Sequence, residues 1–233
     1  NIPETIGEAW LTFEQLNNTA LFDVHALHPR YGIGGADFSS TTDLTAAVVL
    51  FMLPNDPHIY VMAMFWLPEE LLERRVREDR IPYDLWKDQG YLRTCEGNKV
   101  RQKDVTDWFL EVQNDLDCYI YRGGYDAWSA SYWVDEMQET FGKGVFTPVQ
   151  QTMKVLSLPM KQLGADFDSK LIVYNNNPVL KWCLANTGIV EDKNGNIKPN
   201  KTSKARKRID GLAALLDAFV VFQDCQDDYK SML

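Results

Sequence analysis

Residues 34–46 of this chain are Gly34-Gly35-Ala36-Asp37-Phe38-Ser39-Ser40-Thr41-Thr42-Asp43-Leu44-Thr45-Ala46, and they join two apolar runs. The runs, 31–38 and 44–53, are rich in β-branched and large apolar residues and are bounded by turn formers, which is typical of buried strands. A strand pair joined here places Asp37 at the end of the first strand, beside a polar turn. Because burying a bare carboxylate is costly, Asp37 must be solvated, hydrogen-bonded or bound to a cation.

Three interpretations of Asp37 compete on these residues. It can be a turn-capping residue, with Ser39 and Ser40 satisfying the backbone. It can also be a metal ligand at the head of a sheet, or part of a phosphate-facing loop like that of actin-like kinases, where small residues and hydroxyls follow an Asp. The glycines within 32–35 do not form a dinucleotide fingerprint, because the third glycine is missing and a strand is expected where a helix is required.

The size and composition fit one substantial domain or two small ones, since the chain has 233 residues, of which 45% are hydrophobic. A net charge of −9 argues against nucleic-acid binding over the whole surface, allows a local basic patch, and fits a site that collects carboxylates for cations. The four cysteines show no CxxC pairing, so zinc is not expected. Free thiols in a reducing compartment are expected instead. No apolar run is long enough to span a bilayer, no signal peptide is predicted, and the initial Asn indicates a piece of a longer protein.

The order of elements predicts an α/β domain over 31–233, preceded by a linker segment over 1–30. Strands at 31–38, 44–53 and 58–67 are joined by short turns, so they form an antiparallel meander. The remaining chain is predicted to contain helices at 68–79, 83–89, 103–117, 127–141, 151–167 (bent or broken near Pro159), 179–186 and 211–222, strands at 92–95, 118–125 and 144–149, and a β-hairpin near 189–199.

Three carboxylates fall at junctions between these elements. Asp37 and Asp126 end predicted strands, and Asp210 opens the last helix, where a helix N-cap is the ordinary interpretation. A three-strand meander followed by helix–strand–helix alternation is the order of the ribonuclease H-like fold, a mixed sheet of antiparallel and parallel strands flanked by helices. In that order the strand ending at Asp126 can lie beside the first strand, and the last helix brings Asp210 to the same edge.

A cluster of three carboxylates has a clear chemical consequence. Three carboxylates within several Å cannot all stay ionised without a counter-charge, which divalent cations supply. Mg²⁺ prefers oxygen ligands and keeps several waters, so it suits a few carboxylates together with a substrate phosphate. Two such ions roughly 3.5–4 Å apart activate a water and stabilise a leaving 3′-oxygen during phosphodiester cleavage, so no side chain is needed as the nucleophile.

Four stretches give the sequence a specific resemblance to the nuclease domain of the large terminase subunit of tailed bacteriophages, of the HK97-like type. Residues 35–46 resemble the first acidic motif of that family, and Gly124-Tyr125-Asp126 resembles the second. The segment that precedes the hairpin in that family is resembled by a third stretch of this chain, Asn177-Pro178-Val179-Leu180-Lys181-Trp182 with Ala185-Asn186. The third acidic motif of that family is resembled by Lys207-Arg208-Ile209-Asp210-Gly211-Leu212-Ala213-Ala214-Leu215. The whole match runs from about Tyr31 to Phe222.

The resemblance implies a DNA endonuclease domain that cuts concatemeric viral genomes, using Mg²⁺ or Mn²⁺ in a two-ion site with little sequence specificity. In the full protein an N-terminal ATPase domain precedes it, and the portal and the small terminase subunit are further partners in the host cytoplasm. This chain has no G-x-x-x-x-G-K-[ST] pattern, so the motor half is not part of it. The isolated domain is expected to be a monomer that binds double-stranded DNA and no membrane.

By motif position, the resemblance assigns catalysis and metal binding to three residues, Asp37, Asp126 and Asp210. Two further candidate ligands are Asp43, in the first motif, and Asp217, two helical turns beyond Asp210, for which a surface or capping role is the alternative. Related domains can place a His just before the last Asp. The position three earlier is Lys207 here, which favours a site made of carboxylates only.

Five cations occur within eight residues just before Asp210, namely Lys201, Lys204, Arg206, Lys207 and Arg208. Beside the last acidic motif of an acidic protein, they are predicted to neutralise backbone phosphates and hold DNA over the metals, with a solvated loop as the alternative. The hairpin around Asn194-Gly195 is either a mobile flap that contacts DNA or gates the site, or a plain surface hairpin.

Two other functions stay open on the sequence alone. An actin-like ATPase or sugar kinase shares the sheet and the Asp–hydroxyl loop, but it requires a second phosphate loop and an adenosine motif, and the sequence shows neither. A noncatalytic packaging module that docks on a portal or on DNA predicts that the junction carboxylates are dispensable and that no divalent ion binds.

Overall fold

The computed structural model describes residues 9–38, 44–127, 133–201 and 208–233. Within these ranges seven strands form one mixed sheet in the order β4-β3-β2-β1-β5-β6, with β7 paired to β3. The strands of this sheet are β1 (Tyr31–Asp37), β2 (Thr45–Phe51), β3 (Ile59–Pro68), β4 (Leu92–Cys95), β5 (Tyr119–Asp126), β6 (Phe146–Val149) and β7 (Ile172–Val173). A separate hairpin is formed by β8 (Thr187–Glu191) and β9 (Ile197–Lys201).

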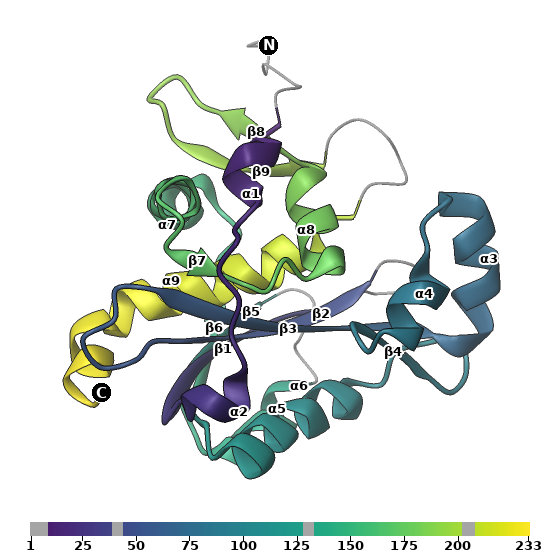
Figure 1. Ribbon diagram of the computed structural model, residues 1–233, viewed down its shortest axis with the longest axis horizontal. Coiled ribbons are helices and arrows are strands. Elements are labelled where there is room, and N and C mark those ends of the chain that lie inside the picture. Colours follow the sequence, from purple (N-terminus) through teal and green to yellow (C-terminus); the bar gives the residue numbers. More distant parts are fainter. Residues whose placement is uncertain (1–8, 39–43, 128–132, 202–207) are drawn as a thin grey trace.

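Helices cover both faces of the sheet (Figure 1). One face carries α7, α8, α9 and the β8–β9 hairpin, the other carries α5 and α6, and α3 and α4 lie at the β4 edge. The helices are α1 (Phe13–Leu16), α2 (Val24–Leu27), α3 (Glu69–Asp79), α4 (Tyr83–Asp88), α5 (Gln102–Leu116), α6 (Trp133–Phe141), α7 (Met153–Asp168), α8 (Pro178–Ala185) and α9 (Asp210–Ser231).

The two faces of the sheet build two separate hydrophobic cores. Side chains alternate between the faces along a strand, so Ile33 and Val48 pack into the core under α9, whereas Ala36 and Val49 pack into the core under α5 and α6. Every residue of β2 is buried, because this central strand is covered on both faces. A continuous apolar run is therefore what the strand requires.

The long helix α9 crosses this sheet and packs on β1, β2 and β5. Its first half is apolar on almost every side, and residues from Leu212 to Phe222 are buried with few exceptions. This pattern fits a helix enclosed between the sheet and the neighbouring helices α7 and α8, which it also contacts. None of the helices in the described ranges combines the length and the apolar character needed to cross a bilayer.

The pairing of the strands confirms the predicted order. β1, β2 and β3 form an antiparallel meander, and β5 is parallel to β1. The hairpin is also confirmed, with Glu191 paired to Ile197 across the turn, and all four cysteines are free thiols.

Three details of the predicted elements were wrong. α7 runs through Pro159 without a break, α9 extends to Ser231 with a kink at Cys225 rather than ending at residue 222, and the short strand β7 was not predicted. Propensity alone does not decide the extent of α7 and α9, because these two helices pack against each other and packing adds stability that local preference lacks.

The described part of the predicted linker segment, residues 9–30, packs on the domain. The Trp10 N–H donates a hydrogen bond to the Thr187 carbonyl at 2.9 Å, and the Tyr174 hydroxyl donates one to the Leu16 carbonyl at 2.5 Å. Leu11 and Leu16 are buried in the core under α9. The division into a linker and a domain at residue 31 stays a prediction.

Candidate active site

Asp37 and Asp126 are the last residues of two neighbouring parallel strands. In the register of β1 and β5, Ala36 is paired with Tyr125, so the next residue on each strand is one of these two aspartates. Adjacent strands lie about 4.8 Å apart. The register therefore places the two carboxylates side by side at the carboxyl-terminal edge of the sheet, where open α/β sheets bind their ligands.

Both aspartates lie on the face of the sheet that α9 covers. A Cβ atom added to Gly35 would meet the Ala214 carbonyl oxygen at 2.1 Å, and one added to Gly124 would meet the Asp217 carbonyl oxygen at 2.4 Å. These two glycines therefore let the backbone of α9 rest directly on β1 and β5. Because strand residues two apart share a face, Asp37 and Asp126 share the face of the glycines that precede them by two.

Asp210 is the first residue of α9 and is only 5% exposed. The N-cap residue is Ile209, and no side chain caps this end of the helix, so the interpretation of Asp210 as an N-cap is wrong. Asp210 lies four residues, about one helical turn, before Ala214, which rests on Gly35. Along β1, Asp37 lies two residues beyond the same glycine.

The thiol of Cys183 on α8 lies in the electrostatic field of both Asp37 and Asp210. Burial raises the pKa of this thiol, the nearby carboxylates of Asp210 and Asp37 raise it further, and the Arg208 guanidinium opposes them. Cys183 therefore lies within the electrostatic reach of residues from the end of β1 and from the start of α9. That Asp37, Asp126 and Asp210 share one site stays a prediction.

Asp217 lies deeper under the sheet and is 1% exposed. Its Oδ1 accepts a hydrogen bond from the Gln151 side chain at 2.8 Å, and its Oδ2 has no hydrogen-bond partner among the described residues. Burial raises the pKa of this carboxyl well above its ordinary value, and the charge of Asp126 raises it further. This burial contradicts the expected surface role, whereas the role of Asp217 as a further ligand stays a prediction.

The carboxylates do not form a finished ligand set. Among the described residues, no group of three or more His, Cys, Asp or Glu side chains is arranged so that it could hold a metal ion. Asp43, the other proposed ligand, falls outside the described residues.

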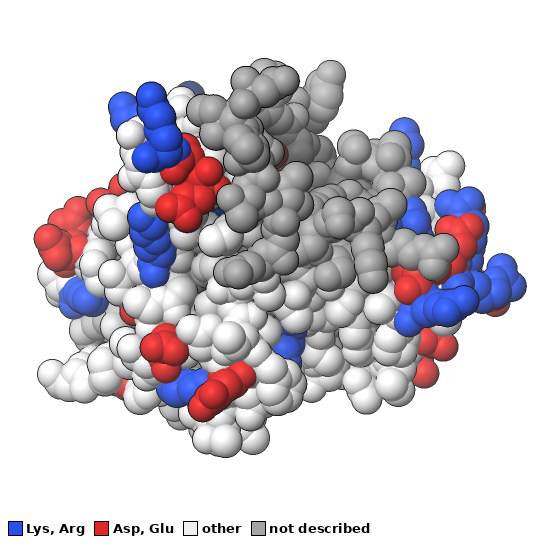
Figure 2. All heavy atoms as spheres, turned by 90° about the horizontal axis from the view of Figure 1, so that it is seen from above, with Lys and Arg blue, Asp and Glu red and all other residues white. Residues whose placement is uncertain are grey.

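The structure corrects one of the five predicted DNA contacts. Arg208 is 6% exposed, and its Nη2 lies 3.6 Å from Asp79 Oδ2, so its charge is used inside the protein and is not presented to DNA. Lys201 ends β9, and Lys204, Arg206 and Lys207 lie outside the described residues. On the face seen in Figure 2, the described basic side chains are interspersed with acidic ones, so no uniformly basic surface appears among them.

Sequence reasoning did not single out Gln151 and Asp79, which contact Asp217 and Arg208. Gln151 connects Asp217 to the end of β6, since its amide also donates to the Val149 carbonyl at 3.3 Å. Asp79 forms an ion pair with Arg208, which lies more than a hundred residues later in the sequence. Neither residue belongs to a motif, and only the tertiary contacts of α3 with Arg208 and of the segment after β6 with α9 reveal them.

A family model described as "Terminase large subunit, endonuclease domain" matches residues 1–225. The chain belongs to this family. The terminase large subunit of Enterobacteria phage HK97 is 32% identical over 191 residues, which cover 80% of this chain and 36% of that protein. Protein YmfN of Escherichia coli strain K12 is 23% identical over 194 residues, which cover 78% of this chain and 41% of that protein. The chain thus spans well under half the length of these relatives.

Solved structures of terminases share the fold of this chain. The crystal structure of the HK97 bacteriophage large terminase matches with a TM-score of 0.78 and 27% identity, covering 92% of this chain and 43% of that one. The nuclease domain of the SPP1 large terminase with bound Mn matches with a TM-score of 0.50 and 14% identity, covering 89% and 94%. The predicted ribonuclease H-like fold is confirmed, and the terminase nuclease family is favoured over the kinase and docking-module alternatives.

Proposed function

We propose that this terminase nuclease domain hydrolyses phosphodiester bonds of double-stranded DNA with the help of divalent cations held by Asp37, Asp126 and Asp210. The observation that carries the proposal is the position of Asp37 and Asp126, side by side on the face covered by α9. Members of the family are nucleases by description. Structures with bound magnesium, from phage G20c, and with bound Mn, from phage SPP1, support the use of such a cation.

The donor set fits a hard divalent cation. Two strand ends and one helix start supply carboxylate oxygens, which Mg²⁺ and Mn²⁺ prefer over the nitrogen and sulfur ligands that zinc takes. Asp210 is buried, and the thiol of Cys183, which lies near it, stays protonated because burial and both carboxylates raise its pKa. Bound divalent cations, one or two, would polarise the scissile phosphate and promote deprotonation of a water.

The residues of the chain itself perform the remaining tasks. Asp37 and Asp126 hold positive charge at the sheet edge, and the helix that begins at Asp210 closes the buried side of the site. The basic run that contains Lys204, Arg206 and Lys207 precedes Asp210 in the sequence and is proposed to bind backbone phosphates. Contacts of this kind position DNA without reading its sequence, so cleavage is expected at many sites.

The proposal extends to the whole protein by family membership. An N-terminal ATPase domain, the portal and the small terminase subunit are the proposed partners, and the host cytoplasm is the proposed location, where concatemeric viral DNA is cut during packaging. The isolated domain is proposed to act as a monomer.

Supercoiled plasmid incubated with the domain in Mg²⁺, Mn²⁺ or EDTA tests the function. Nicked and linear products are expected with either cation and none with EDTA. Asp37→Ala, Asp126→Ala and Asp210→Ala should each remove cleavage while circular dichroism and the melting temperature show a folded domain. A single variant that still cuts at the full rate would remove its residue from the site.

A further inference from the structure

Arg208, two residues before Asp210, forms a buried ion pair with Asp79 at the end of α3. Its Nη2 lies 3.6 Å from Oδ2 of Asp79, the last residue of α3, and the two side chains are 8% and 3% exposed. Asp79 also lies 3.8 Å from Arg75 Nη1 and accepts a hydrogen bond from the Tyr83 hydroxyl at 3.0 Å. Asp79 therefore connects α3, α4 and the residues just before α9.

The backbone of Arg208 is held as well as its side chain. The Asn186 amide, just after α8, donates a hydrogen bond to the Arg208 carbonyl at 3.3 Å. Only Ile209 separates this anchored residue from Asp210. Arg208 is therefore fixed from two sides immediately before the helix begins.

The start of α9 needs such anchoring. No side chain caps this helix end, so local capping does not define its first turn. The second residue of α9 is also closely packed, because a Cβ atom on Gly211 would lie 3.0 Å from Phe65 and 3.1 Å from Leu180. A buried ion pair is weak evidence for stability, because desolvation offsets its attraction, but it does require one defined geometry.

We propose that Asp79 is a positioning residue for the nuclease site: it holds Arg208 and, through Arg208, sets the place of Asp210 beside Asp37 and Asp126. This inference rests on the proposed function. Asp79 touches neither DNA nor cation, and its effect passes through one residue of the third acidic motif. Displacing a reacting group by about 1 Å can cost roughly 100-fold in rate, so a defined helix start matters even though the anchor is remote.

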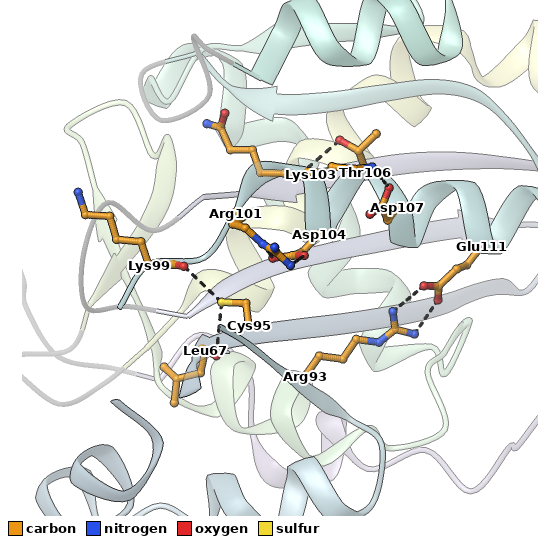
Figure 3. Close-up of polar contacts among 11 residues, drawn as sticks. Leu67, Arg93, Cys95, Lys99, Arg101, Lys103, Asp104, Thr106, Asp107 and Glu111 are labelled. Atoms are coloured by element: carbon orange, nitrogen blue, oxygen red, sulfur yellow. Dashed lines mark hydrogen bonds and ion pairs between the residues drawn. The ribbon is translucent and has the colours of Figure 1, made fainter. Parts of the chain in front are cut away.

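Three variants and one control test this role. Asp79→Asn leaves Arg208 and Arg75 buried without their shared carboxylate, and Arg208→Met leaves Asp79 with Arg75 alone, so each variant should destabilise the protein. The double variant Asp79→Asn/Arg208→Met removes both charges, so its melting temperature should recover relative to Asp79→Asn. The control is Glu111→Gln, which removes the charge and one of the two oxygens that accept hydrogen bonds from Arg93 at 2.9 and 2.7 Å, on the other face of the sheet (Figure 3).

Plasmid cleavage in saturating Mn²⁺ separates positioning from stability. We expect the double variant to cut roughly 10- to 100-fold more slowly than the wild type although its stability has recovered, and Glu111→Gln to cut within about twofold. A double variant that recovers stability and also cuts within twofold of the wild type would overturn the inference, because a purely structural pair would then explain all effects.

Hydrogen exchange tests the same claim without any activity. Backbone amides of residues 213–216, the first in α9 whose acceptors lie one helical turn earlier, should exchange faster in the double variant than in the wild type and at the wild-type rate in Glu111→Gln. If the wild type fails to cut plasmid, the proposed function is wrong, and this exchange measurement still decides the role of Asp79. Exchange that stays at the wild-type rate in the double variant would refute it.

Discussion

Asp37 and Asp126 end adjacent parallel strands and lie side by side on the face of the sheet that α9 covers. They are 89 positions apart in the sequence, which is the offset of the paired residues Ala36 and Tyr125. The parallel pairing of β1 with β5 therefore creates the candidate site, and the glycine two residues before each aspartate allows α9 to close it.

Substitution of these glycines should separate α9 from the sheet. Gly35→Ala and Gly124→Ala place a methyl group 2.1 and 2.4 Å from backbone oxygens of α9, so each should cost about 1–3 kcal/mol or more of unfolding free energy. Urea denaturation measures this loss, and plasmid cleavage should fall with it. The control is Gly164→Ala in α7, where the nearest atom is 3.4 Å away and where Ala favours the helix. Equal stability of Gly35→Ala and Gly164→Ala would contradict the close packing of α9.

The role of Asp217 is tested by an isosteric change. Because this carboxyl is buried, bound to Gln151 and resistant to ionisation, Asp217→Asn should retain cleavage within about tenfold of the wild type. Isothermal titration of Mn²⁺ into the DNA-free domain should give the same affinity for both proteins. Loss of Mn²⁺ binding in Asp217→Asn would instead make Asp217 a ligand.

Phosphate contacts of the basic run should appear in the salt dependence of DNA binding. The triple change of Lys204, Arg206 and Lys207 to Ala should weaken binding of a labelled duplex in EDTA and reduce the slope of log K against log salt by about 2.7, at 0.9 per contact. Fluorescence anisotropy over a salt series measures both quantities.

The control for this series removes three cations elsewhere. Arg74 and Arg77 on α3 and Lys87 on α4 are changed to Ala, and the slope should stay near that of the wild type. A greater loss of slope in this control than in the basic-run variant would place the DNA on α3 and α4.

The stability of the domain should depend on pH through Asp166. Burial raises the pKa of this carboxyl, and the hydrogen bond from Gln162 and the charge of Lys230 oppose the rise. The folded state then binds the proton more tightly than the unfolded state, whose Asp pKa is about 3.9, so stability falls as pH rises from about 4 through the raised pKa. Asp166→Asn keeps the acceptor for Gln162 and removes the titration.

The measurement for Asp166 is a set of melting curves between pH 3 and pH 8. The advantage of Asp166→Asn over the wild type should grow with pH. Asp192→Asn is a control of opposite sign, because hydrogen bonds from Asn196 and Asn194 lower the pKa of Asp192. Loss of this carboxylate should therefore lower stability more at pH 7 than at pH 3. A constant difference between Asp166→Asn and the wild type at every pH would contradict this reasoning.

The sequence predicted the features that depend on local pattern and element order. Apolar runs bounded by turn formers located β1, β2 and β3, and the order of elements placed β5 beside β1, which was enough to bring Asp37 and Asp126 together. Asp210 was placed at the start of the last helix on the same grounds, and the structure agrees.

The environment of single side chains could not be predicted in the same way. Arg208 belongs to a run of cations that suggests an exposed DNA contact, yet the approach of α3 buries it against Asp79. Asp217 was given a surface or capping role as the alternative to a ligand, yet it is only 1% exposed and accepts a hydrogen bond from Gln151, a residue outside its helix. Both outcomes depend on contacts between segments far apart in the chain, and local composition does not record those contacts.

Anomalous diffraction from crystals soaked in Mn²⁺ tests the central claim most directly, because it locates the cation without relying on activity. The account predicts a manganese peak at the carboxyl-terminal edge of β1 and β5, about 2.0–2.2 Å from carboxylate oxygens of Asp37 and Asp126, and its disappearance in Asp37→Asn. Soaked crystals with no peak there, or with manganese bound only elsewhere, would contradict it.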